Sequence, residues 1–406
     1  MNFATSLLLI LQKSAKSIQL HLNEFFERLQ PEAPPSATPS AWTQTRAKLN
    51  ASAFVALNEE AVLAEFYQPD NPQKDWCGHR LLAADGSEAL LPNSEEMGRY
   101  FGWNQPVNQK GPCAAPYILG RISVLYDVNN HLVLDGILSR YTVGEIELAE
   151  QHLAHTQAED VTLYDRGYCG YEWLARHHQQ GRHYICRVPR RSFGAAEALF
   201  AANQAGVSQR VVLEPPPSQR ARLRALGLPL RLEVRLVTVR LSTGELEVLV
   251  TDLLDEAQYQ VGDFAEAYRR RWGVEPFYGL IKGRLGLENF SGRTVESVFQ
   301  DFQASLLITN LESILSRESQ EELQAGRPPE QLPVAVNHAV AFNALKNQIL
   351  ALLYRRDLPV DAVLDRLREL FRGNPVRQRP GRLVPRSPPN RRRSLNFLRY
   401  RKKIVF

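Results

Sequence analysis

Apolar residues in the first part of the chain recur every three or four positions, which is the spacing of one face of an α-helix. This pattern predicts helices over residues 3–29 and 41–67. Several prolines stand between them: Pro31, Pro34, Pro35 and Pro39. Because proline cannot continue a helix, this stretch is predicted to be a linker. The N-terminal residues are therefore expected to form a small helical module.

From residue 80 onward the pattern changes to short apolar runs, which are typical of buried β-strands. These runs cover 81–84, 118–126, 132–138, 161–164 and 184–188. The turn sequence Asp127-Val128-Asn129-Asn130 separates the second run from the third and predicts a β-hairpin. Helical patterns at 143–156 and 173–180 lie among the later strands. The predicted fold class is therefore α/β.

A further change of pattern marks residues 190–260. Here Leu230, Leu232, Val234 and Leu236 alternate with charged residues, which is the period of a half-exposed strand. A turn at 242–244 follows, and the apolar residues 246–250 form the returning strand. We predict a β-rich insertion over 191–261, after which helical patterns resume and continue to residue 372.

The composition excludes several classes of protein. The 406 residues are 44% hydrophobic and 23% charged, which excludes wholesale disorder. The four cysteines are scattered and include no CxxC pair, so we expect reduced thiols and neither a disulfide scaffold nor a structural zinc. The longest apolar run near the start, residues 7–11, is far shorter than the roughly 20 residues that span a bilayer. We expect a cytoplasmic protein without a signal peptide.

The positive charge gathers at the C-terminal end of the chain. The net charge is +5, yet residues 376–406 hold 11 basic residues and no acidic one. They include the blocks Arg391-Arg392-Arg393 and Arg401-Lys402-Lys403. Such blocks attract polyanions by releasing counterions, and nucleic acid is the usual partner. A solvated tail without a partner is the alternative interpretation.

Two aspartates share one local setting. Asp85 and Asp165 each follow an apolar strand and stand one or two residues before a glycine. A strand end holds such a carboxylate rigidly and leaves it accessible, and two of them on neighbouring strands repel unless a cation lies between them. Mg²⁺ and Mn²⁺ are the cations that prefer carboxylate oxygens. The alternative is that each aspartate is an ordinary turn residue.

A third carboxylate comes from the predicted helix 264–285. Four polar residues follow one another at steps of three, four and seven: Tyr268, Arg271, Glu275 and Lys282. On a regular α-helix these steps place all four on one face. Glu275 then suits a metal, Arg271 and Lys282 suit phosphate oxygens, and the Tyr268 hydroxyl is a hydrogen-bond donor. Gly273 and Pro276 interrupt the helical pattern, and a solvated face with ion pairs is the alternative.

With these residues in place, the chain resembles the DDE transposases of bacterial insertion sequences. It is similar to the insertion-sequence-four type, to which the transposon-five enzyme is related. The spacing Tyr268-x2-Arg271-x3-Glu275-x6-Lys282 matches the YREK signature of that type, and LLAADGS and VTLYDRGY resemble its two Asp motifs. The resemblance covers about residues 77–316.

The resemblance implies a ribonuclease H-like catalytic core interrupted by the β-rich insertion, with helical N- and C-terminal regions. The expected parts are a DNA-binding module at 1–76, core segments at 77–190 and 262–320 around the insertion 191–261, and a helical region with the basic tail at 321–406. It also implies that Asp85, Asp165 and Glu275 are catalytic and bind two Mg²⁺ ions, with Mn²⁺ as a substitute. Arg166, Tyr268, Arg271 and Lys282 are expected to contact DNA.

The implied reaction is cut-and-paste transposition, with water attacking DNA at transposon ends and the freed 3′-hydroxyl joining the target. Expected partners are double-stranded DNA, as terminal repeats and target, and a second copy of the chain in a synaptic homodimer at the bacterial nucleoid. A DNA-binding protein without catalysis, or a ribonuclease H-like nuclease without strand transfer, are the alternatives. No tryptophan stands between Trp173 and Trp272 to stack on a flipped base, so another aromatic residue must do so if a DNA hairpin forms.

Two histidines offer a possible zinc pair. His152 and His155 are three positions apart and share a helix face if residues 143–156 are helical. No HExxH pattern or third ligand accompanies them, so we interpret both as ordinary surface histidines.

Overall fold

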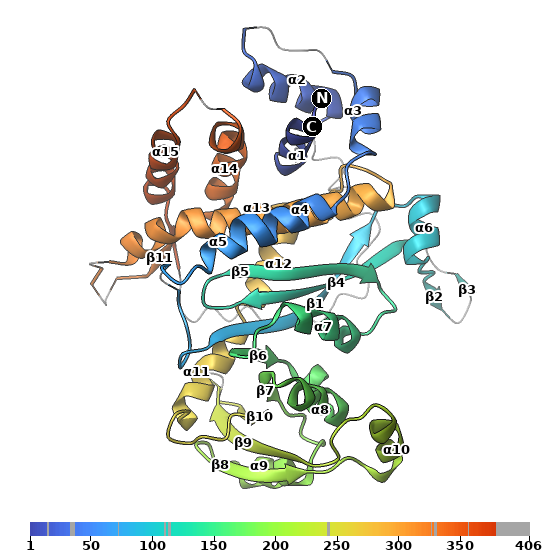
Figure 1. Ribbon diagram of the computed structural model, residues 1–406, viewed down its shortest axis with the longest axis vertical. Coiled ribbons are helices and arrows are strands. Elements are labelled where there is room, and N and C mark those ends of the chain that lie inside the picture. The colour runs from blue at the N-terminus through green and yellow to red at the C-terminus, as the bar shows by residue number, and fades with distance from the viewer. Residues whose placement is uncertain are drawn as a thin grey trace. The chain divides into compact units, whose positions relative to one another are not determined.

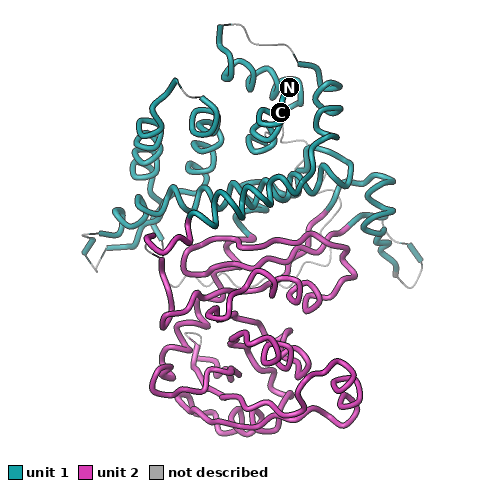
Figure 2. Tube along the Cα trace, viewed as in Figure 1, with its two compact units in different colours: residues 1–65, 91–118, 279–406 teal, residues 66–90, 119–278 magenta. Residues whose placement is uncertain are grey.

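The computed structural model describes residues 1–378 except 14–15, 33–36, 72, 109–110, 113–114, 242–243, 326, 329–330 and 356. The two basic blocks at 391–393 and 401–403 lie outside the described residues. Figure 2 shows two compact units: unit 1 holds residues 1–65, 91–118 and 279–406, and unit 2 holds residues 66–90 and 119–278. No helix in the described part of the chain is long and apolar enough to cross a membrane.

Unit 2 is built on an eight-stranded mixed sheet (Figure 1) with the order β5-β4-β1-β6-β7-β10-β9-β8. The strands are β1 (Arg80–Leu91), β4 (Ile118–Asp127), β5 (Leu132–Arg140), β6 (Asp160–Tyr164), β7 (His183–Arg187), β8 (Ser208–Leu213), β9 (Leu232–Arg240) and β10 (Leu246–Thr251). β6 pairs in parallel with β1 and with β7, whereas the pairs β4–β5, β7–β10, β10–β9 and β9–β8 are antiparallel. The predicted hairpin is confirmed as β4 and β5, and the predicted α/β class is confirmed.

Helices of unit 2 pack on this sheet. They are α7 (Glu145–His152), α8 (Tyr171–Gln180), α9 (Gly194–Ala202), α10 (Pro217–Ala225) and α11 (Val261–Arg271), with one-turn 3₁₀ helices η2 (Leu153–His155) and η3 (Arg166–Tyr168). One apolar cluster joins buried residues of the central strands to α7, α8 and α9. Leu82, Tyr164 and Trp173 are buried members of it, so the cluster fixes β1, β6 and α8 against one another.

Unit 1 is mostly helical. Its elements are α1 (Phe3–Leu11), α2 (Ile18–Leu29), α3 (Pro39–Arg46), α4 (Ser52–Ala56), the π-helix η1 (Leu57–Leu63), α5 (Ala64–Phe66), α6 (Glu95–Phe101), α13 (Val295–Gln324), α14 (His338–Leu353) and α15 (Val360–Gly373). Two short strand pairs accompany them, β2 (Val107–Asn108) with β3 (Gly111–Pro112) and β11 (Val334–Ala335) with β12 (Val376–Arg377). Helix α5 ends one residue past the boundary of unit 1.

The two long N-terminal helices predicted from the sequence are wrong as single helices. The first is broken between α1 and α2, where the Ser17 hydroxyl accepts a hydrogen bond from the N–H of Leu20 and starts a new helix. The second begins at Pro39 behind the Thr38 cap and is broken after Arg46. Side-chain capping by Ser17 overrides a continuous apolar spacing at the first break, whereas α4 begins after the second break without a side-chain cap.

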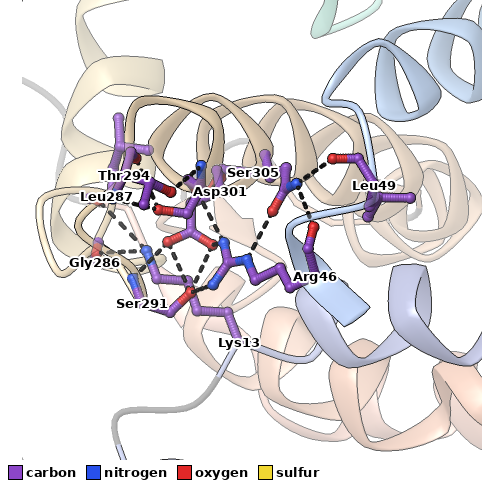
Figure 3. Close-up of polar contacts among 11 residues, drawn as sticks. Lys13, Arg46, Leu49, Gly286, Leu287, Ser291, Thr294, Asp301 and Ser305 are labelled. Carbon is purple, nitrogen blue, oxygen red and sulfur yellow. Dashed lines mark hydrogen bonds and ion pairs between the residues drawn. The ribbon is translucent and has the colours of Figure 1, made fainter. Parts of the chain in front are cut away.

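A buried polar network holds the N-terminal helices to α13 (Figure 3). The Arg46 guanidinium donates to Asp301 Oδ1 at 2.8 Å, to Gln300 Oε1 at 2.7 Å and to the Ser297 carbonyl at 2.9 Å. Asp301 also accepts from the Ser291 N–H and hydroxyl. The Arg46–Asp301 pair is nearly inaccessible to water, so its partners must stay together.

Candidate active site

β1 and β6 bring the two predicted aspartates into equal register. Their parallel ladder runs from Arg80 opposite Asp160 to Ala83 opposite Leu163. Asp85 and Asp165 each lie two residues beyond that last pair, on neighbouring strands. The carboxyl end of the parallel ladder therefore presents two acidic side chains next to each other.

Asp85 lies inside a strand and not at the end of one, which corrects the sequence-based interpretation. β1 continues to Leu91 because Ala89 and Leu91 are buried and extend the apolar alternation past Gly86. Only the pairing of β1 with β6 ends near Asp85.

The surroundings of Asp85 favour its neutral form. Burial raises the pKa of Asp85 to about 6, while the N–H of Gly86, which donates to Asp85 Oδ1 at 2.9 Å, and the positive charge of Arg271 oppose that rise. The charges of Glu145 and Asp165 add to it. An ionised Asp85 is therefore short of compensating positive charge.

Asp165 begins the one-turn helix η3. Its Oδ1 accepts from the N–H of Arg166 at 2.7 Å, which caps that turn. Arg166 itself is exposed. On the neighbouring strand, Arg187 Nη1 lies 3.9 Å from Asp165 Oδ1, and Arg187 also pairs with the buried carboxylate of Glu247. Asp165 thus lies beside the positively charged side chain of Arg187, and its own carboxylate is partly exposed.

The four-residue signature does not lie on a single helix. α11 ends at Arg271 and α12 (Val274–Gly283) begins after Gly273, so the predicted helix 264–285 is wrong as a continuous element. Pro276 is in the first turn of α12, where a missing N–H costs no helical hydrogen bond. The sequence break at these two residues is therefore a real helix break.

The break still leaves Arg271 and Glu275 in contact. Arg271 is buried, and its Nη2 lies 3.7 Å from Glu275 Oε1. The same guanidinium acts on Asp85, as the pKa of that aspartate records. The Tyr278 hydroxyl of α12 donates to the Asp85 carbonyl at 2.7 Å. Glu275 and Asp85 are therefore connected through Arg271 and through α12.

Lys282 lies further along the helix that carries Glu275. It lies in the last turn of α12, in residues that belong to unit 1. Seven residues of helix place its Cα about 10 Å along the axis from that of Glu275.

Three buried polar atoms near the carboxylates have no hydrogen-bond partner: the Tyr168 hydroxyl, the Tyr268 hydroxyl and Arg271 Nε. Burial raises the pKa of both phenols, so both remain neutral donors at neutral pH. Asp85 and Asp165 are among the charges that act on Tyr168, and Asp165 acts on Tyr268. Unsatisfied donors beside acidic groups suit a ligand that brings acceptor oxygens, such as a phosphodiester or hydrated cation.

The donor set is all oxygen, which fits Mg²⁺ or Mn²⁺. Among the residues that the structure describes, no three Asp, Glu, His or Cys side chains gather closely enough to hold a metal ion. The fit therefore rests on the type of donors and on the unsatisfied polar atoms.

Sequence reasoning missed three residues of this neighbourhood: Glu145, Tyr168 and Arg187. Tyr168 lies within the quoted motif VTLYDRGY, and Arg187 closes the strand next to β6. Glu145 opens α7, the helix after the β4–β5 hairpin. If the strand order is assigned from the sequence, Arg187 can be identified as a neighbour of Asp165. No local sequence pattern indicates that Glu145 belongs to the site.

His152 is not a surface histidine, and that interpretation is wrong. It is 1% exposed, its Nε2 lies 2.9 Å from the Ser123 hydroxyl, and its Nδ1 lies 2.6 Å from Asp135 Oδ2. These bonds fix α7 to the β4–β5 hairpin. His155 is on the adjacent turn, with Nε2 3.7 Å from the same carboxylate.

The model of the transposase DDE domain family matches residues 76–311, which is more than half of the chain. The chain belongs to this family.

Its relatives are transposases. The chain is 27% identical over 279 residues to the transposase InsG for insertion sequence element IS4 of Escherichia coli K12, covering 68% of this chain and 61% of InsG. It is 28% identical over 151 residues to the putative transposase InsZ of the same organism, covering 36% of this chain and 48% of InsZ. Thus the chain spans about half to three fifths of the length of these relatives.

Among solved structures, a piggyBac transposase synaptic complex with hairpin DNA aligns with a TM-score of 0.42 and 11% identity, over 93% of this chain and 77% of that one.

Proposed function

We propose that this protein is a transposase that cleaves DNA at the ends of an insertion sequence and joins them to a target. The observation that carries the proposal is the position of Asp85 and Asp165, each two residues beyond the last pair of the parallel β1–β6 ladder, with Glu275 connected to Asp85 through Arg271. Membership of the transposase DDE domain family supports the same assignment.

The fold supports a ribonuclease H-like core. In the order β5-β4-β1-β6-β7, an antiparallel hairpin flanks a parallel set, with Asp85 in β1 and Asp165 directly after β6. We assign the core to 77–190 and 262–320. The strands β8, β9 and β10 and the helices α9 and α10 lie in the proposed insertion 191–261.

Asp85, Asp165 and Glu275 are the residues that would hold Mg²⁺, or Mn²⁺ in its place. Two such ions, when bound, activate the attacking oxygen and neutralise charge on the leaving oxygen. Asp85 is held for this role by the Gly86 N–H and by the Tyr278 contact to its carbonyl. Glu275 is exposed in the first turn of α12.

The remaining site residues bind and orient DNA. The Tyr268 hydroxyl and Arg271 Nε, both without partners, would donate to phosphate oxygens. Arg166 is exposed next to Asp165 and would contact the same backbone. Lys282 and the basic tail would add charge along the duplex. Two DNA ends must meet during the reaction, so we infer a homodimer in the synaptic complex, with the 1–76 module contacting the ends.

The test is cleavage and joining of labelled DNA that carries the terminal repeats of the protein's own element. Asp85→Asn, Asp165→Asn and Glu275→Gln should each abolish cleavage in Mg²⁺ and leave DNA binding intact. Glu197→Gln, an exposed change on α9, is the matched control and should remain active. Cleavage at the wild-type rate by any of the three variants would refute the assignment of the catalytic residues. Nicks without joined products would show that the protein is a nuclease without strand transfer.

A further inference from the structure

Glu145 is an acidic residue beside the site, and it is not one of the three proposed catalytic residues. It is the first residue of α7, and its Oε1 accepts from Arg121 Nη1 of β4 at 2.7 Å. The Glu145 carboxylate is about two-fifths exposed, so the ion pair does not bury it. Arg121 therefore holds the Glu145 side chain by one oxygen while the side chain stays partly exposed.

The Glu145 side chain packs on the backbone directly after Asp85. A Cβ added to Gly86 would lie 3.0 Å from Glu145 Cγ and 3.1 Å from both Cδ and Oε1. These distances are shorter than normal van der Waals contacts, so any larger residue at position 86 would press on the carboxylate. The absence of a side chain at Gly86 is what lets Glu145 approach Asp85.

An unsatisfied donor lies next to the same two carboxylates. Tyr168 is 1% exposed, and its hydroxyl has no hydrogen-bond partner. Burial is the main cause that raises the pKa of Tyr168, and the nearby carboxylates of Asp85, Glu145 and Asp165 add to it. A buried hydroxyl without an acceptor costs free energy, and a cation's water molecule or a phosphate oxygen supplies one.

We propose that Glu145 is a fourth acidic residue of the site, a positioning residue that strengthens the binding of a divalent cation beside Asp85. This role rests on the proposed function. Glu145 adds negative charge next to Asp85, while Arg121 balances that charge until the cation arrives. The Tyr168 hydroxyl then donates to a water molecule of the hydrated cation or to the DNA phosphate.

The experiment is calorimetric titration of the full-length, metal-free protein with Mn²⁺ in the absence of DNA. Glu145→Gln should weaken Mn²⁺ binding by roughly tenfold, the lower end of what outer partners of a metal site contribute. Glu145→Asp keeps the charge and should bind more tightly than Glu145→Gln. Glu147→Gln is the matched control, because Glu147 is exposed in the same first turn and has the same effect on the helix dipole.

DNA cleavage supplies a readout that a merely structural role would not move. In Glu145→Gln the Mg²⁺ concentration for half-maximal cleavage should rise roughly tenfold, with the maximal rate at saturating Mg²⁺ reduced far less. If Glu145→Gln binds Mn²⁺ as tightly as the wild type, the inference is overturned. It is also overturned if Glu147→Gln loses as much Mn²⁺ affinity as Glu145→Gln. Because Asp85→Asn is measured in parallel, undiminished Mn²⁺ binding by that variant would instead refute the metal site of the proposed function.

Discussion

Replacing Asp85 by asparagine is expected to make the metal-free protein more stable while it abolishes cleavage. The ordinary pKa of this side chain is 3.8, and burial raises it to about 6 in the folded protein. Folding therefore favours the neutral carboxylic acid, and the ionised form destabilises the fold. Asparagine is neutral, has a similar shape, and keeps an oxygen that accepts from the Gly86 N–H.

The size of the effect follows from the pKa. A difference of about 2 units corresponds to about 3 kcal/mol at 1.36 kcal/mol per unit. The sign is that of an acid with a raised pKa: the penalty is absent below pH 3.8, grows between 3.8 and about 6, and is complete above. Asp85→Asn should thus gain about 3 kcal/mol at pH 8 and roughly half of that at pH 5.

Urea unfolding in a chelating buffer, followed by circular dichroism, measures the free energy of unfolding of both proteins at both pH values. Added Mg²⁺ should raise the stability of the wild type and not that of Asp85→Asn, because a ligand stabilises only the state that binds it. Equal or lower stability of Asp85→Asn at pH 8, or a gain that does not shrink at pH 5, would refute the reasoning.

Three further changes test other parts of the structure by urea unfolding. Burial and the nearby charge of Lys13 lower the pKa of Lys346 from 10.5 to about 8. Lys346→Met should therefore stabilise the protein by up to about 3 kcal/mol at pH 7, and this gain should fall as the pH rises from 8 toward 10.5. A gain that does not depend on pH would contradict this prediction. Arg46→Met leaves Asp301 buried without its cation and should cost about 3–5 kcal/mol, and a cost below 1 kcal/mol would show that water reaches the pair. Tyr278→Phe removes the hydrogen bond to the Asp85 carbonyl and should lower the free energy of unfolding by about 1 kcal/mol. An unchanged free energy of unfolding would mean that the contact is only apolar.

Local patterns predicted the strands well because burial is periodic along the chain. The hairpin β4–β5 and the strands β6, β7, β9 and β10 all lie where apolar runs or alternation placed them. Helix lengths were less predictable. Apolar spacing continues from α1 to α2 and from α3 to α4, but the structure has separate helices, with α2 beginning at the Ser17 cap and α3 ending at Arg46. Such interruptions depend on single hydrogen bonds, which an apolar pattern does not record.

The candidate site was predictable only where its residues carry a local signal. Asp165 ends a strand, and the spacing from Tyr268 to Glu275 is a signature in itself. Glu145 comes close to the backbone after Asp85, and pairs with Arg121 of β4, only when α7 packs on the sheet, which is a long-range event. The pairing of Arg187 with Asp165 likewise requires the order of β6 and β7.

The discontinuity of the two units has a consequence for synthesis on the ribosome. The chain crosses between the units four times, and Arg46 meets Asp301 only after 255 further residues have been made. Until then the first helices lack their buried partner, and a nascent chain must carry an unmatched guanidinium and exposed apolar faces. We expect these early segments to be the ones that a chaperone engages, and a fragment that stops before α13 to be a poor folder.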